Sequence, residues 1–144
     1  MTFNFNIAGG WLIDLTGITN MESVDEFITY INEDENTFIE LWIYDIVDKK
    51  GSDVENVETL LTDMYDTSTV ESLETEAIYS NMQIAGKAIV YYCIDKESNV
   101  TYWMLEDVKV KGTQYLLSRM FYPTEEYKTW AIRVWNSIIK LEDN

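Results

Sequence analysis

The chain has 144 residues, 47% of them hydrophobic and 14% aromatic, with 26 acidic residues against 10 basic ones. This length and apolar content are sufficient for one compact domain with a substantial core. No window approaches the roughly 18 consecutive apolar residues that predict a membrane-spanning helix. A net charge of −16 would repel nucleic-acid phosphates, so the composition argues against direct binding of DNA or RNA.

The charge is confined to the first half of the chain. Residues 1–78 contain 18 acids against Lys49 and Lys50, a net charge of −16, whereas residues 79–144 contain 8 acids and 8 bases. Such a field would attract a basic partner. A surface that only keeps the protein soluble explains the same charge, and both interpretations stay open.

The first twenty residues and the single cysteine bear on the compartment and the redox chemistry of the protein. Residues 1–20 lack a basic segment followed by an apolar run, so we find no secretory signal and expect a cytoplasmic protein. The single cysteine, Cys93, cannot form an internal disulfide bond. Its neighbours are apolar and aromatic, which predicts a buried thiol rather than a nucleophile.

The chain opens with a predicted β-hairpin. Apolar and polar residues alternate over 3–7 and again over 11–15, and Gly9-Gly10 separates the two segments. Residues 17–22 are predicted to form a loop.

The next segment has two interpretations. Ser23 and Glu26 have the spacing of a capping box, which predicts a helix over 24–31. The residues that follow are of β-favouring types, and they precede a strongly apolar strand. We therefore favour a hairpin of 26–32 with 37–46.

An amphipathic helix is predicted over about 53–65, where apolar residues recur at helical spacing behind a capping pair, Ser52 and Glu55. Glu55 and Glu58 fall on its outer face. Four strands of a meander are expected downstream, at 73–80, 86–95, 99–109 and 113–121.

The chain ends in a second predicted helix, over about 124–141. Pro123 precedes it, and Thr124 is placed to cap it. Trp135 lies at the edge of its apolar arc, and two interpretations of it stay open: a partly exposed anchor for a partner, or packing at the rim of the sheet. The apolar face itself consists of Tyr127, Trp130, Ala131, Val134, Ile138 and Leu141. We expect this face to cover the sheet.

These elements predict a single α+β domain over 1–144. All strands are expected to share one antiparallel sheet of about six to eight strands, with the helices at about 53–65 and 124–141 packed on it.

The sequence contains no histidine, which removes the commonest general base and every Ser-His or Cys-His nucleophile. Paired carboxylates remain as a catalytic option. Glu40 and Glu106 are the nearest candidates because each lies in the middle of a predicted strand, and we expect both to face solvent. The sequence thus argues against an enzyme, and a carboxylate-based hydrolase is the remaining catalytic alternative.

A metal site is also not expected. Asn32, Asp34 and Asn36 alternate as the first ligands of a calcium loop would, but Thr37 stands where the loop needs glycine and Ile43 where it needs glutamate. We expect no cofactor.

The order of elements resembles the PsbP-like and DcrB-like domains. The residues that carry the likeness are Phe3, Phe5, Gly10 and Trp11 at the opening strands, Gly86-Lys87-Ala88 at a strand entry, and Tyr127, Trp130, Ala131 and Ile138 in the final helix. The resemblance implies a curved antiparallel sheet flanked by helices. It also implies an adaptor, assembly factor or effector chaperone without catalysis, and it transfers no functional residue.

The leading hypothesis is a non-catalytic, acidic, protein-binding module that acts on a basic partner, for example an immunity protein or an effector chaperone. The alternative from another class is a small-ligand carrier whose pocket, between sheet and helix, is lined by Tyr91, Tyr102 and Trp103. The candidate partner-binding residues are Glu33, Asp34, Glu35, Glu55, Glu58 and Trp135.

Overall fold

The computed structural model describes residues 4–8, 10–14, 18–24, 27–32, 37–66, 71–79, 84–95 and 97–140. In chain order, the elements within these ranges are β1 (Asn4–Ala8), β2 (Trp11–Asp14), β3 (Ile18–Val24), β4 (Phe27–Asn32), β5 (Phe38–Asp45), α1 (Asp53–Asp66), β6 (Glu71–Tyr79), β7 (Ala85–Ile94), β8 (Thr101–Lys111), β9 (Gln114–Tyr122), the 3-10 helix η1 (Glu125–Tyr127), α2 (Lys128–Ser137) and β10 (Ile139–Lys140). Neither α-helix of these ranges is long and apolar enough to cross a membrane.

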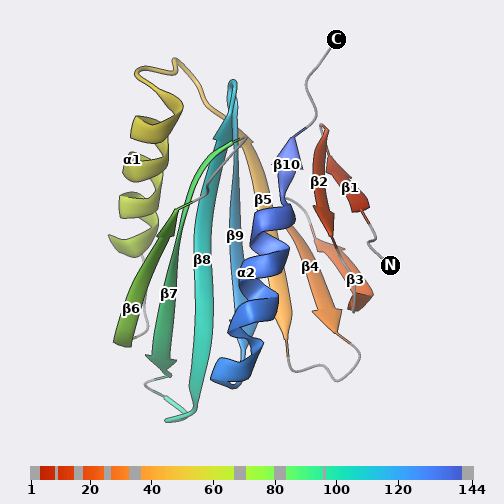
Figure 1. The fold of residues 1–144 in the computed structure, drawn as a ribbon, viewed down its shortest axis with the longest axis vertical. Coiled ribbons are helices and arrows are strands. Elements are labelled where there is room, and N and C mark those ends of the chain that lie inside the picture. Colours follow the sequence, from red (N-terminus) through yellow and green to blue (C-terminus); the bar gives the residue numbers. More distant parts are fainter. Residues whose placement is uncertain are drawn as a thin grey trace.

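The strands divide between two antiparallel sheets (Figure 1). Seven strands follow the order β3-β4-β5-β9-β8-β7-β6, and the other three follow the order β1-β2-β10. The predicted α+β class and the strand number of the main sheet are confirmed. The prediction of a single sheet is wrong, because the opening hairpin pairs with β10 at the other end of the chain, for example Leu12 with Ile139.

The two helices lie on opposite faces of the seven-stranded sheet. Along β8, Leu105 belongs to the core under α2, whereas Val108 and Val110 belong to the core under α1. Alternate residues of a strand point to opposite faces, so β8 contributes to both cores. In Figure 1, α2 lies in front of the sheet, and α1 packs on β7 and β8.

The terminal helix is shorter than predicted. It ends at Ser137, because Ile138 is extended with ψ 115° and the chain continues as β10. Thr124 precedes η1 but its side chain makes no capping hydrogen bond, so that detail of the prediction is wrong. The apolar face is confirmed at Ala131, Val134 and Ile138, which are buried, and Leu141 lies outside the described residues.

Between residues 17 and 66, one prediction from the sequence is wrong and two are confirmed. The predicted loop over 17–22 is wrong, since β3 occupies Ile18–Val24. The hairpin of 26–32 with 37–46 is confirmed by the pairing of β4 with β5, and the helix alternative over 24–31 is excluded. The cap of α1 is confirmed as well, because Ser52 Oγ accepts a hydrogen bond of 3.2 Å from the backbone N–H of Glu55.

Candidate functional site

A group of aromatic residues shares the α1 side of the seven-stranded sheet. The register places Tyr44 opposite Tyr115 and pairs Tyr115 with Val110, which lies under α1, so all three point to the same face. We call this group the aromatic face; its residues are Phe38, Trp42 and Tyr44 of β5, Tyr115 and Phe121 of β9, and Tyr102 of β8. Each of these side chains is half-buried, so the face is partly open to solvent.

The rings of the aromatic face contact one another across strands. The ring centroids of Tyr44 and Tyr115 are 5.4 Å apart, and those of Tyr102 and Phe121 are 6.1 Å apart. Both pairs lie in the range that stabilises neighbouring strands. The face is therefore an ordered surface built on three adjacent strands.

A row of charged residues crosses the aromatic face. Glu40 of β5, Arg119 of β9 and Glu106 of β8 occupy adjacent register positions. The Arg119 Nε donates a hydrogen bond of 2.8 Å to Glu106 Oε2, and the Arg119 guanidinium lies 5.6 Å from the centroid of the Trp42 ring. The Glu106 side chain is only 2% exposed, and Arg119, whose side chain is 31% exposed, acts as the counter-charge of this buried acid.

The expectation that Glu40 and Glu106 face solvent is wrong. Glu106 is buried, and Glu40 is half-buried. The reason is that both acids lie on inner strands of the seven-stranded sheet, Glu106 on β8 between β9 and β7 and Glu40 on β5 between β4 and β9. The sequence shows both acids in mid-strand, but the pairing with Arg119 depends on a register that the pattern does not reveal.

Glu40 differs from Glu106 in its partners. Among the described residues no hydrogen bond to the Glu40 carboxyl is present, although Arg119 is its neighbour across the strands. Burial raises the pKa of the Glu40 carboxyl above its ordinary value of 4.5, and the charge of Arg119 opposes this shift only in part. Glu40 is therefore a partly desolvated acid whose carboxyl receives no hydrogen bond from the described residues.

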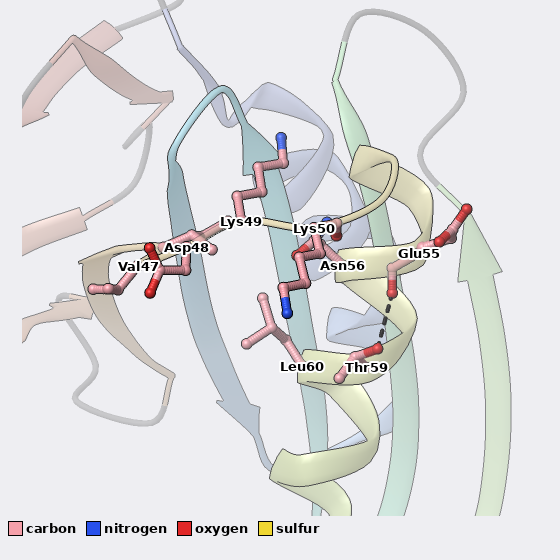
Figure 2. A pocket seen from close by; sticks show the side chains of 9 residues that line it. Val47, Asp48, Lys49, Lys50, Glu55, Asn56, Thr59 and Leu60 are labelled. Carbon is pink, nitrogen blue, oxygen red and sulfur yellow. Dashed lines mark hydrogen bonds between the residues drawn. The ribbon is translucent and has the colours of Figure 1, made fainter.

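An open hollow of about 280 Å³ lies where the segment after β5 meets α1 (Figure 2). It is lined by Ile46, Val47, Asp48, Lys49, Lys50, Glu55, Asn56, Thr59 and Leu60. Ile46 and Leu60 pack against the buried cluster of Val57, Leu61, Val108 and Val110, and so does Tyr115 of the aromatic face. The hollow and the aromatic face therefore border the same apolar cluster. Val47 at its rim is 83% exposed. The hollow thus extends the accessible surface from the sheet onto the first turns of α1.

Hydrogen bonds hold the walls of the hollow in place. Lys49 Nζ donates to the carbonyl oxygen of Gly112 at 2.6 Å and also pairs with the Asp53 carboxylate. Asn56 Nδ2 donates to the carbonyl oxygens of Lys50 at 3.0 Å and Ser52 at 2.7 Å. The segment between β5 and α1 is consequently fastened both to the helix and to the β8–β9 turn.

Among the predicted partner-binding residues, the three that the structure describes do not form one site. Glu55 is exposed and lines the hollow. Glu58 forms an ion pair with Lys87 of β7 at 3.1 Å, so it helps to hold α1 on the sheet. Glu33, Asp34 and Glu35 lie outside the described residues.

Of the two interpretations of Trp135, the partly exposed anchor is wrong and packing is confirmed, because its side chain is 0% exposed. Helix α2 packs against β8 of the large sheet and against β2 of the small one. A helix covered on two sides buries a wider arc than the one predicted for a single covering sheet. Trp135 falls within that wider arc.

A buried lysine and a buried aspartate, Lys109 and Asp107, lie close to each other on the α2 side of the sheet. Lys109 Nζ donates to the carbonyl oxygens of Trp135 at 2.6 Å and Ile138 at 2.7 Å, and it lies 5.0 Å from the centroid of the Trp135 ring. Burial lowers the pKa of Lys109 to about 8, and Asp107 opposes this shift. Burial also raises the pKa of the Asp107 carboxyl, which accepts a hydrogen bond from Ser118 Oγ. This pair lies inside the core and holds the end of α2.

The aromatic residues proposed for a ligand pocket do not share a face. Tyr91 and Tyr102 lie on the α1 side, whereas Trp103 lies on the other side, where its ring is 4.8 Å from Tyr92 and 6.4 Å from Tyr122. Cys93 is fully buried on the α1 side, as predicted. In the described ranges, no three His, Cys, Asp or Glu side chains are grouped as potential metal ligands.

The two sheets, the helices on opposite faces of the larger one and the pairing of the chain's two ends define a PsbP-like α+β fold. The solution structure of cyanobacterial PsbP (CyanoP) from Synechocystis sp. PCC 6803 superimposes with a TM-score of 0.69 at 12% sequence identity, covering 96% of this chain and 92% of that one. The predicted PsbP-like resemblance is confirmed at the level of the fold. Its DcrB-like part stays a prediction.

A second solved structure has the same arrangement. It is a crystal structure of a protein from Bacteroides thetaiotaomicron VPI-5482, with a TM-score of 0.63 at 10% identity. The match covers 99% of this chain and 50% of that one, so this chain corresponds to about half of the longer protein. No protein-family profile and no curated protein sequence matches the chain.

Proposed function

We propose that the chain is a non-catalytic binding module of the cytoplasm that holds a basic protein through the aromatic face. The observation that carries the proposal is the half-burial of six aromatic side chains around a row in which two carboxylates meet one arginine. Partly exposed aromatic rings are typical anchors at protein interfaces. The row adds a net negative charge at the centre of such an anchor surface.

The distribution of charge supports a basic partner. Residues 1–78 carry the whole net charge of −16, and α1 with its hollow belongs to that half. Two lysines close to α1 are already paired, Lys49 with Asp53 and Lys87 with Glu58. At the hollow the exposed Glu55 is matched by the exposed Lys50, so the negative field comes from the excess of acids over the whole first half of the chain. This field would steer a basic protein toward the aromatic face.

A sharper form of the proposal is an immunity protein or an effector chaperone that covers a basic toxin or effector. A small, strongly acidic domain would suit that task, since it neutralises the charge of its partner while anchoring on aromatic rings. The proposal of no catalysis is supported by the lack of histidine and by the position of Arg119 between Glu40 and Glu106.

The test is affinity capture from the cytoplasm of the native organism, with mass spectrometry and a salt titration of the captured complex. We expect a basic protein whose binding weakens as salt rises. The variant Trp42→Ala should lose the partner. Trp130→Ala is the matched control, because Trp130 is also half-buried but lies on α2, across the sheet. Both variants are checked for folding by circular dichroism. An acidic partner, salt-independent binding or equal losses in the two variants would refute the proposal.

A further inference from the structure

We propose that Glu40 and Trp42 form a receptor site for a guanidinium group, supplied by an arginine side chain of the basic partner. The inference rests on the proposed function for the nature of that partner. It goes further by assigning the recognised chemical group and the two residues that recognise it.

The first argument is the hydrogen bonding of the charged row. Arg119 directs its Nε to Glu106 Oε2 at 2.8 Å, and Glu106 is the buried member of the row. Glu40 is more accessible, and within the described part of the chain no donor hydrogen-bonds to its carboxyl. The row therefore holds one negative charge in excess, and the excess lies at Glu40. A second cation, supplied by a partner, would balance the charge of the row.

The second argument is the geometry of β5. Glu40 and Trp42 are two positions apart on one strand, so their side chains leave the same face about 7 Å from each other. A planar guanidinium pairs with a carboxylate through two parallel hydrogen bonds while its flat side lies on an aromatic ring. Arg119 already lies 5.6 Å from the centroid of the Trp42 ring, so an incoming guanidinium would share this ring with Arg119.

The third argument distinguishes arginine from lysine. The register places Phe38 opposite Phe121 on one side of the row, and Trp42 lies on the other. An arginine side chain is weakly hydrated and flat, so it suits a carboxylate between aromatic walls better than the strongly hydrated ammonium of lysine. The site thus fits a residue type that, with tryptophan and tyrosine, is enriched at the centre of protein interfaces.

The experiment titrates the protein with N-acetyl-arginine amide and, in parallel, with the neutral N-acetyl-citrulline amide. The readout is the indole N–H signal of Trp42 in the NMR spectrum, assigned with the Trp42→Phe variant. We expect a saturable shift with the arginine compound and none with citrulline. Glu40→Gln should weaken the binding roughly tenfold, the factor for loss of a charge-assisted hydrogen bond. Glu125→Gln, which removes an equal charge from an exposed position in η1, should leave it unchanged.

Equal effects of Glu40→Gln and Glu125→Gln, or equal shifts with arginine and citrulline compounds, would overturn the inference. If Glu40→Gln fails to fold, the comparison of the two compounds on the wild-type protein decides. The result is separable from the proposed function. If the Glu40→Gln variant still captures the basic protein, the arginine site alone is refuted. If the wild-type protein captures no basic protein, the proposed function is refuted, and the titration with the small compounds still tests the arginine site independently.

Discussion

Lys109 and Ile138 are joined by a hydrogen bond of 2.7 Å, from the lysine ammonium to a carbonyl oxygen just beyond the end of α2. The carbonyls at a helix C-terminus have no partners within the helix, and a cation there also complements the helix dipole. Strand β10 follows directly after Ile138 and pairs with β2. One buried side chain therefore fixes the point at which the chain leaves α2 for the small sheet.

The first prediction is that Lys109→Met lowers the free energy of unfolding by about 3–5 kcal/mol, because Asp107 would remain buried without its counter-charge. The double variant with Asp107→Asn should recover part of this loss, since it removes the uncompensated acid. Urea denaturation monitored by circular dichroism measures both. Lys50→Met serves as the control, because Lys50 is exposed. A loss below about 1 kcal/mol in Lys109→Met would show that the pair contributes little.

The second prediction concerns pH. The pKa of Lys109 is lowered to about 8 from an ordinary value of 10.5, mainly by burial. Between these two pH values the unfolded chain retains a proton that the folded chain has released, so the free energy of unfolding rises with pH across this window. Wild-type protein should therefore gain stability relative to Lys109→Met between about pH 8 and about pH 10, a comparison that cancels the titration of the tyrosines. Parallel profiles for the two proteins would contradict the expectation.

Asp107 produces the opposite trend at lower pH. Burial raises the pKa of its carboxyl well above the ordinary 3.8, so the folded chain binds the proton more tightly than the unfolded chain. The resulting stabilisation is complete below pH 3.8 and is lost as the pH rises through the raised pKa. Asp107→Asn should remove this slope from the urea-denaturation profile.

Local patterns in the sequence were sufficient to predict those helices and strands whose signals lie within a few neighbouring residues. The Ser52 cap and the apolar spacing behind it predict α1, and the hydrogen bond between Ser52 and Glu55 confirms its start. The β-favouring run from Phe38 to Asp45 predicts β5 and its hairpin with β4. In each case the signal lies within a few residues of the element.

Features that depend on distant partners could not be predicted in the same way. Trp135 is buried because a second sheet packs on α2, and nothing near Trp135 in the sequence indicates that sheet. Glu106 is paired with Arg119 through a strand register, which alternation alone does not specify. The aromatic face shares this origin, since its members come from three strands.

The third prediction is that Cys93 is unreactive in the folded protein. Burial, with a smaller contribution from Glu106, raises the pKa of its thiol to about 11, and the side chain is 0% exposed. The thiolate that attacks disulfides and alkylating reagents is therefore both scarce and inaccessible. Ellman's reagent near pH 8 should label the thiol only after unfolding in concentrated guanidinium chloride. Rapid labelling of the native protein would show that the α1 side of the sheet opens to solvent.

The fourth prediction separates the two ways in which α1 is held on the sheet. Leu61 is 3% exposed and packs with Val108 and Val110, so Leu61→Ala should lower the free energy of unfolding by about 2–5 kcal/mol. Glu58→Gln removes the ion pair with Lys87, but 47% of the Glu58 side chain is exposed. This variant should therefore lower the free energy of unfolding by less than about 1 kcal/mol.

Chemical denaturation of the two variants measures this difference directly, and Thr62→Ala provides a control on the exposed side of the same helix. If Glu58→Gln were as costly as Leu61→Ala, the helix would be held by charge rather than by apolar packing. Its stability would then fall with added salt, because salt screens an exposed ion pair but strengthens apolar burial when the salt is sulfate. Denaturation in sodium sulfate therefore discriminates the two cases. We expect α1 to be stabilised there, since Val57 and Leu61 bury its contact with the sheet.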